Sequence, residues 1–263
     1  MPSTVIEPSL DGLVLNRRKS DSVDQEQIEE HLQAIDDQIL FHVVHALRIG
    51  MSIEKIYQLS SIEPWFIEKI NNIVQTEAKL KSLPLERGIL SDAKKFGFSD
   101  KQIGRAVNKE ELEIRKIRKG FNIFPVVKQI DTLAAEWPAV TNYLYLTYGG
   151  TSNDISLSTD DSGVVVIGAG PYRIGSSVEF DWGTVNMVWG LQDNGEKNVV
   201  VVNCNPETVS TDYDICKRLY FQELTLESIL DITESEIPKG VVPSFGGQVP
   251  NNLPTKLSNS GSS

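Results

Sequence analysis

Residues 164–175 read Val-Val-Val-Ile-Gly-Ala-Gly-Pro-Tyr-Arg-Ile-Gly, and this stretch decides the fold. Four β-branched residues in a row are typical of a strand buried on both faces, as in a parallel sheet. Gly168 and Gly170 follow at once, and without a Cβ they let the backbone turn sharply and approach a bound group. Acidic residues at 179 and 181 then suit the first turn of a helix. The stretch therefore predicts a strand, a glycine loop and a helix.

The rest of the second half repeats this alternation of strand and helix. Three further strands and one helix are predicted, at Val199–Val202, Leu219–Phe221, Lys239–Val242 and Thr225–Ser235. We therefore expect a doubly wound parallel sheet over residues 164–252. Ligands of such sheets bind beyond the carboxyl ends of the strands. The loops 168–175, 203–212 and 246–248 should meet at that edge.

A nicotinamide dinucleotide site fits this edge poorly. Gly175 comes later than the third glycine of the fingerprint Gly-x-Gly-x-x-Gly, and Asn203 stands where an acidic residue would bind the ribose hydroxyls. The glycines by themselves are also compatible with a purely structural turn that binds no ligand.

The first half has the pattern of a helical domain, which we place at residues 22–150. Apolar residues recur every three or four positions from Ile28 to Leu47, and Ser99 with Gln102 forms a capping box. Residues 1–21 lack a period and predict a flexible lead. Residues 151–163 are rich in Ser, Asp and Gly and predict a linker. The fold class is thus α/β in two parts, an all-helical domain followed by a doubly wound sheet.

The segment from Lys81 to Lys119 has the outline of a helix-turn-helix. It carries eleven basic and six acidic residues, so DNA binding must be weighed. The chain as a whole has a formal net charge of −11, which favours a helical bundle with a solvated basic face and argues against nucleic acid or an anionic membrane as a general partner.

Other features of the composition restrict the remaining classes. No apolar run approaches the roughly 18 residues of a membrane span, and no clear targeting segment is visible, so we expect a cytoplasmic or mitochondrial-matrix protein. Cys204 and Cys216 predict free thiols in a reducing compartment. His31, His42 and His45 share the first helical stretch, and without an acidic or cysteine partner assigned nearby in sequence we expect no metal site.

Several motifs of the chain together point to one family. In the second half they are residues 168–181, Gly-Ala-Gly-Pro-Tyr-Arg-Ile-Gly-Ser-Ser-Val-Glu-Phe-Asp; residues 202–214, Val-Asn-Cys-Asn-Pro-Glu-Thr-Val-Ser-Thr-Asp-Tyr-Asp; residues 218–221; and Gly246-Gly247-Gln248 with Pro250-Asn251-Asn252. These resemble the opening of the second synthetase half of the carbamoyl-phosphate synthetase large chain. The first half resembles the helical oligomerisation domain of the same family, through residues 62–66, 95–100 and 131–136. The resemblance runs from about Ile28 to Asn252 in the family's own order. The motifs Tyr-Arg-Ile-Gly-Ser-Ser and Pro-Asn-Asn resemble those of eukaryotic members, fungal ones among them.

This resemblance implies a function. The family makes carbamoyl phosphate from bicarbonate, ATP and glutamine-derived ammonia, and its second half phosphorylates carbamate in an ATP-grasp module. Residues 164–252 would be the Rossmann-like pre-ATP-grasp lobe, which lines the tunnel that delivers carbamate. The residues carried over to the tunnel are Arg173, Gly175, Glu179 and Glu207, and the loop glycines at strand ends are Gly168, Gly170, Gly246 and Gly247. Alternatively, Arg173 and the two glutamates pair with each other or cap helices.

The sequence departs from the family after Asn252. The family continues into ATP-grasp lobes, whereas residues 253–263 form a tail that does not resemble it and is too short for an ATP-binding module. We therefore expect a fragment, a truncated gene model or a degenerate copy, with no catalytic residue and no cofactor of its own, since ATP and Mg belong to the complete enzyme. Such a chain would not turn over ATP alone.

The resemblance also suggests partners. Residues 22–150 would drive self-association or bind other synthetase segments, and a glutaminase subunit would bind only the complete enzyme. Two alternatives remain, a non-catalytic interaction module that docks on a full synthetase and, more remotely, a DNA-binding protein. The residues do not distinguish arginine from pyrimidine synthesis.

Overall fold

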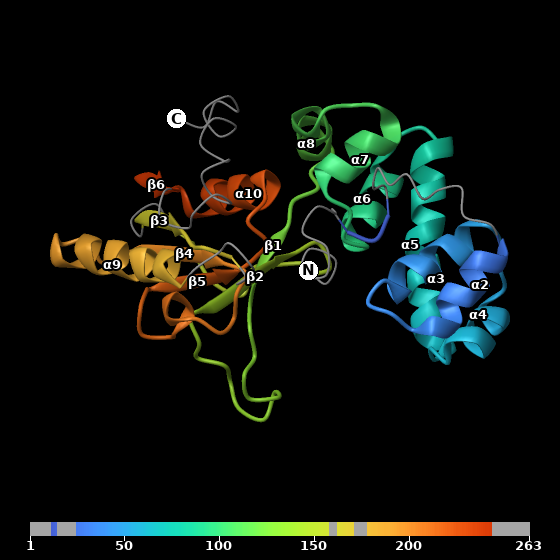
Figure 1. The fold of residues 1–263 in the computed structure, drawn as a ribbon. Helices are drawn as coiled ribbons and strands as arrows, with labels where there is room; N and C mark the ends of the chain where they lie inside the picture. The colour runs from blue at the N-terminus through green and yellow to red at the C-terminus, as the bar shows by residue number, and fades with distance from the viewer. Residues whose placement is uncertain (1–11, 15–24, 158–161, 171–177, 244–263) are drawn as a thin grey trace. The chain divides into compact units, whose positions relative to one another are not determined.

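The chain folds into two compact units, residues 1–122 and 123–263 (Figure 1). The computed structural model describes residues 12–14, 25–157, 162–170 and 178–243. A helical unit comes first, and a unit built on a mostly parallel sheet follows, so the predicted α/β class is confirmed. None of the helices within these described ranges is long and apolar enough to cross a membrane.

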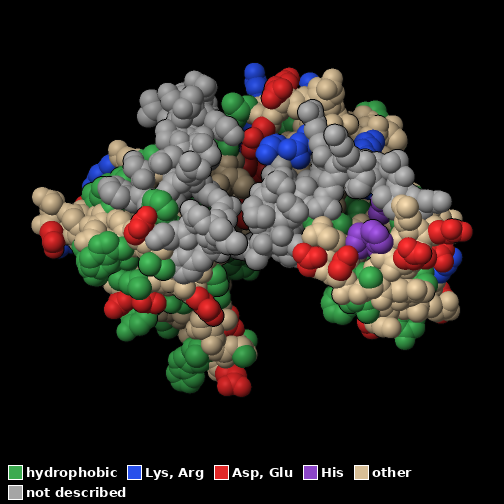
Figure 2. Space-filling model, in the orientation of Figure 1, with side chains coloured by type: hydrophobic (Ala, Val, Ile, Leu, Met, Phe, Trp, Pro, Cys, Tyr) green, Lys and Arg blue, Asp and Glu red, His purple; other side chains and the backbone are tan. Residues whose placement is uncertain are grey.

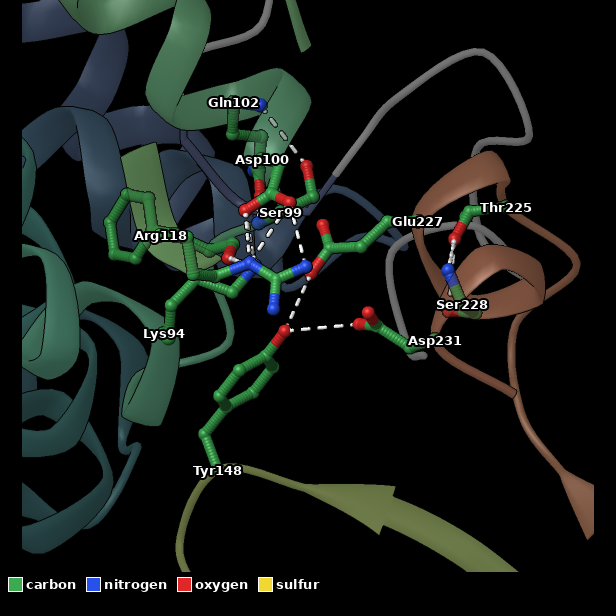
Figure 3. Close-up of polar contacts among 11 residues, drawn as sticks. Lys94, Ser99, Asp100, Gln102, Arg118, Tyr148, Thr225, Glu227, Ser228 and Asp231 are labelled. Atoms are coloured by element: carbon green, nitrogen blue, oxygen red, sulfur yellow. Dashed lines mark hydrogen bonds and ion pairs between the residues drawn. The ribbon is translucent and has the colours of Figure 1, made fainter. Parts of the chain in front are cut away.

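The first unit is a bundle of short helices. Those described are α2 (Gln25–Ala34), α3 (Ile39–Arg48), α4 (Ile53–Ser60), α5 (Pro64–Ser82), α6 (Arg87–Lys95), α7 (Asp100–Val107) and α8 (Glu111–Gly120). Their ends follow the sequence signals: Ser52 caps α4, and Pro64 begins α5. The predicted capping box is confirmed, because Ser99 Oγ accepts from the Gln102 N–H at 3.1 Å and the Gln102 side chain accepts from the Ser99 N–H at 2.9 Å (Figure 3).

A buried ionic cluster joins α6, α7 and α8. Arg118 Nε donates to both Asp100 carboxylate oxygens at 3.1 Å, and Lys94 Nζ lies 3.2 Å from Asp100 Oδ1 (Figure 3). These three side chains are almost completely buried, and so is Arg115. Three of the eleven basic residues between Lys81 and Lys119, namely Lys94, Arg115 and Arg118, are therefore not part of a solvent-facing surface.

The histidines of the first unit have one acidic neighbour that the sequence reasoning overlooked. The rings of His31 and His42 pack edge to face with centroids 4.5 Å apart, and His42 Nε2 lies 3.4 Å from Asp36 Oδ1. Within the part of the chain that the structure describes, however, no group of three His, Cys, Asp or Glu side chains could hold a metal ion.

The second unit is a six-stranded sheet of order β1-β2-β5-β4-β3-β6. The strands are β1 (Val126–Gln129), β2 (Tyr143–Thr147), β3 (Val164–Ile167), β4 (Val199–Asn203), β5 (Arg218–Phe221) and β6 (Gly240–Val242). Only the β1–β2 pair is antiparallel, and the other four neighbouring pairs are parallel. The remaining described elements are α9 (Glu179–Asp193), the short 3-10 helix η2 (Val209–Thr211) and α10 (Leu226–Glu236).

Helices cover both faces of this sheet. Alternate residues of a strand point to opposite faces, so Val165 and Ile167 pack with Ile229 of α10, whereas Val166 packs with Val185 of α9. All five residues of β4 are buried, as expected of a central parallel strand. The doubly wound arrangement is the predicted one.

Residues 123–150 differ from the expectation of a helical domain ending near 150. They belong to the second unit, because β2 pairs in parallel with β5 through Tyr143↔Leu219 and Leu144↔Tyr220. Val127 and Leu144 are buried in the same core as α10. The unit boundary therefore lies at Asn122 and Ile123, and β1 and β2 extend the sheet beyond β5.

Side-chain networks fix α10 to the sheet. Arg218 of β5 donates to Glu236 at 3.0 Å from Nε and 2.6 Å from Nη2, and the Tyr220 hydroxyl donates to the same carboxylate at 2.5 Å. Burial is the first reason that the pKa of Tyr220 is raised. Near the start of α10, the Tyr148 hydroxyl lies 3.1 Å from Glu227 Oε1 and 3.2 Å from Asp231 Oδ2 (Figure 3).

Candidate functional site

The candidate site lies at the edge of the sheet where β3 and β4 end. β3 pairs in parallel with β4 on one side and with β6 on the other, so the carboxyl ends of all three strands reach the same edge. This is the edge at which the sequence placed three loops. Gly246 and Gly247 of the third loop lie outside the described residues.

The turn after β3 needs its two glycines. A Cβ on Gly168 would lie 2.7 Å from Asn203 Nδ2 and 2.8 Å from Asn203 Cγ, which is closer than side chains approach one another. Gly170 has φ +77°, a left-handed conformation that residues with a Cβ rarely adopt. A side chain at either position would therefore strain the turn, and the absence of a Cβ at Gly168 makes room for Asn203.

Asn203 joins this turn to the loop after β4. Its side chain is fully buried. Its Oδ1 accepts from the Gly170 N–H at 3.0 Å and the Asn205 N–H at 3.2 Å, and its Nδ2 donates to Ser210 Oγ at 3.2 Å. One amide thus binds two backbone N–H groups and one side-chain hydroxyl, and buried polar groups of this kind need such partners.

The loop after β4 is fixed at two more points. Asn205 Oδ1 accepts from the Glu207 N–H at 3.0 Å. Asp181, in the first turn of α9, accepts from the Ser210 N–H at 3.1 Å through Oδ2. Asp181 is buried, and its Oδ1 has no hydrogen-bond partner among the described residues. The start of α9 and the β4 loop are therefore tied together.

The structure places two of the four predicted tunnel residues. Glu179 begins α9 and Glu207 lies in the loop after β4, and both side chains are exposed. Arg173 and Gly175 lie outside the described residues. Asn203 and Asp181 connect the segments that carry the two glutamates, but no distance between the glutamate side chains supports a direct pair. Their role in a tunnel stays a prediction.

The two cysteines differ in environment. Cys216 precedes β5 and is buried, which raises the pKa of its thiol to about 12. Cys204 is half-buried in the loop after Asn203. Both are free thiols, in agreement with the expectation from their number.

Comparison with known proteins decides the family. A family model described as "Carbamoyl-phosphate synthetase large chain, oligomerisation domain" matches residues 3–122, and one described as "Carbamoyl phosphate synthase preATP-grasp domain" matches residues 160–263. The chain belongs to the carbamoyl-phosphate synthetase large-chain family. The first match ends at the boundary between the two structural units. The second covers β3 to β6 and runs on through residues 253–263, which the sequence alone had placed outside the family.

Relatives of this synthetase family match most of the chain. It is 49% identical over 233 residues to the multifunctional protein CAD of Squalus acanthias, and this alignment covers 87% of the present chain and 10% of the CAD protein. It is 46% identical over 261 residues to the mitochondrial carbamoyl-phosphate synthase [ammonia] of Rattus norvegicus, covering 97% and 17%. For the arginine-specific large chain of Eremothecium gossypii the identity is 47% over 237 residues, covering 88% and 21%. The chain thus spans about a tenth to a fifth of the length of these relatives.

Sequence reasoning missed two residues of this synthetase edge. From the sequence, Asn203 was considered only as a residue that cannot replace the acid of a ribose-binding site. Asp181 was considered only as an acidic residue in the first turn of a helix. A signal was available for Asn203, because an amide directly after a fully buried parallel strand must find partners within its own loops. For Asp181 the partner, Ser210, lies in another loop, and its position next to α9 follows only from the fold.

Proposed function

We propose that the chain is a scaffold for carbamoyl phosphate synthesis. Its helical part would bind other synthetase segments, and the edge of its sheet would line the passage through which carbamate moves. The observation that carries this proposal is the buried Asn203 amide, which fixes the β3 turn to the loop that bears Glu207. A passage for a reactive intermediate needs walls that do not move, and a braced rim of this kind supplies them.

The chemistry of carbamate gives the rim its purpose. Carbamate is an unstable acid, so sequestering it from bulk water preserves it until it is phosphorylated. Carboxylates such as Glu179 and Glu207 would help to exclude or neutralise protons along the way, with Arg173 also facing the passage and Gly175 leaving it open. The described edge offers amides, hydroxyls and carboxylates held by backbone N–H groups, which suits a wall better than a reaction centre.

Replacing Glu207 tests the proposal in a complete synthetase, including its glutaminase, whose large chain carries this segment. We expect Glu207→Ala to uncouple the reactions, so that more glutamine is hydrolysed per carbamoyl phosphate formed. Asp193→Ala is the matched control, because Asp193 is an exposed acid at the opposite end of α9. If glutamine hydrolysis stays coupled in Glu207→Ala, the tunnel role is wrong.

Association is the proposed role of the first unit. The match to an oligomerisation domain supports contact with other synthetase segments, whether further copies of this chain or a full synthetase. Light scattering tests self-association, and a strict monomer at high concentration would count against it. Cytoplasm or mitochondrial matrix is the proposed compartment, and a relative from Rattus norvegicus is described as mitochondrial.

The chain is proposed to act without catalysis of its own. We expect the purified chain to show no bicarbonate-dependent ATP hydrolysis, and turnover would overturn this expectation. ATP and Mg would act in the complete enzyme. The burial of Lys94, Arg115 and Arg118 speaks against the DNA-binding alternative, because backbone phosphates are contacted by exposed cations.

A further inference from the structure

The connection between β1 and β2 is an ordered projection, which we call the β1–β2 arm (residues 130–142). It extends away from the sheet of its own unit (Figure 1). Asp131 holds its bend, because Oδ1 accepts from the Leu133 N–H at 2.8 Å and Oδ2 from the Ala135 N–H at 2.5 Å. At its base Thr141 Oγ1 donates to the Ile130 carbonyl at 3.0 Å. The arm is therefore shaped by its own hydrogen bonds.

This arm presents large apolar side chains to solvent. Trp137 is 72% exposed, Val140 is 89% exposed and Leu133 is 45% exposed. Hydrophobic and acidic side chains gather on the lower projection of the unit (Figure 2). Single exposed apolar residues are ordinary, but three on one short, hydrogen-bonded segment are typical of a surface that another polypeptide covers.

A pocket of about 430 Å³ lies against the arm. Its lining is Gln129, Asp131, Ala135, Glu136, Trp137, Pro138, Ala139 and Asp154. Two of its three carboxylates are already used. Asp131 binds the backbone as described, and Asp154 accepts from Lys128 Nζ at 2.6 Å, the hydrogen bond that chiefly lowers its pKa. The Glu136 carboxylate makes no hydrogen bond or ion pair with the described residues, so an exposed carboxylate stands beside an exposed indole.

We propose that the β1–β2 arm docks a segment of the synthetase large chain that lies outside residues 1–263 and presents a lysine or arginine flanked by apolar residues. The cationic group would pair with Glu136, while its aliphatic stem and apolar neighbours would cover Trp137 and Val140. The choice of occupant rests on the proposed function and on the relatives, in which this region is a tenth to a fifth of a much longer chain.

Peptide binding tests this inference with the full 263-residue chain. The probe is a set of overlapping, fluorescently labelled peptides that cover the arginine-specific carbamoyl phosphate synthase large chain of Eremothecium gossypii. We expect at least one peptide with a basic residue between apolar ones to bind, and Trp137→Ala and Glu136→Lys each to weaken it by about tenfold or more. Reversing the basic residue of that peptide to glutamate should restore binding to Glu136→Lys. Trp182→Ala is the control, because Trp182 is 62% exposed on α9 and should not matter.

Three outcomes would overturn the inference. The first is that no peptide binds, and the second is that neither Trp137→Ala nor Glu136→Lys weakens peptide binding. The third is that the chain forms a concentration-dependent dimer which Trp137→Ala abolishes, since the occupant would then be a second copy. The replaced side chains are exposed, so loss of folding does not confound the result, and circular dichroism verifies this. The Glu207→Ala coupling experiment is independent of these outcomes, so a failure here is distinguishable from a failure of the tunnel proposal.

Discussion

At the scale of single residues, the Asn203 side chain depends on the absence of a side chain at Gly168. The Asn203 amide fills the space that a side chain at position 168 would take, and in return it satisfies the buried N–H of Gly170. The sequence predicted that Gly168 and Gly170 serve the backbone. It could not predict the amide's partners, because Ser210 reaches Asn203 only after the loop between them has folded back.

A double-mutant cycle measures this arrangement. We expect Asn203→Ala to lower the free energy of unfolding by about 3 kcal/mol, because it leaves buried donors unpaired. Gly168→Ala should cost about 1–3 kcal/mol through overpacking. The double variant should cost clearly less than the sum, because alanine at 203 removes the amide that a Cβ at 168 would hit. Urea unfolding gives the three values.

The cycle has a built-in comparison. Gly88→Ala in α6 meets open space and should be neutral or stabilising, as for other helical glycines. Additive effects of Gly168→Ala and Asn203→Ala, within about 0.5 kcal/mol, would show that the two residues do not depend on each other.

Cys216 predicts a pH dependence. Burial raises the pKa of its thiol to about 12 in the folded chain, from an ordinary value of 9.0. As the pH rises, the thiol therefore loses its proton at a lower pH in the unfolded chain than in the folded chain. Its contribution to the free energy of unfolding is fully present below pH 9 and is lost as the pH rises from 9 toward 12. The free energy of unfolding should fall more steeply over this range in the unchanged chain than in Cys216→Ala, by up to about 1.4 kcal/mol per pH unit. Cys204→Ala serves as the control, and parallel curves for the chain and Cys216→Ala would refute the assignment.

At the scale of elements, local signals located the helices and the buried strands. Caps such as Ser99 with Gln102, the proline of α5 and runs of β-branched residues act within a few positions, so sequence alone finds them. The strand β2 was missed. Its ladder to β5 is short, and its partner Leu219 lies far along the chain, so nothing local distinguished Tyr143–Thr147 from the aromatic stretch around it.

The buried cluster of α6, α7 and α8 is the most sensitive point of the first unit. Asp100→Ala would leave Arg118 and Lys94 buried without their carboxylate, and we expect a loss of about 3–5 kcal/mol in the free energy of unfolding. Lys109→Ala breaks only an exposed pair with Glu113 at 3.5 Å and should not shift the unfolding midpoint measurably. Helical circular dichroism in urea follows both. Equal midpoints for the two variants would mean that the cluster does not hold the three helices together.

At the scale of the whole molecule, the order of the two units was predictable and their boundary was not. Motifs in the family's own order identified the helical part and the sheet, and the comparisons confirm that family. The boundary moved to Asn122 because β1 and β2 complete the sheet of the second unit. The tunnel residues Arg173 and Gly175, which the resemblance supplied, are tested by function, since they lie outside the described residues.

The most direct test of the scaffold is the ratio of glutamine hydrolysed to carbamoyl phosphate formed by a complete synthetase, including its glutaminase, whose large chain carries Asn203→Ala. Asn203 touches no substrate in this account, but it fixes the rim of the passage. We predict that the ratio rises above that of the unchanged enzyme, because a loosened wall lets carbamate escape and decompose. A variant that yields less folded enzyme, yet keeps the same ratio, would show that Asn203 serves folding alone and would contradict the proposed passage at this edge of the sheet.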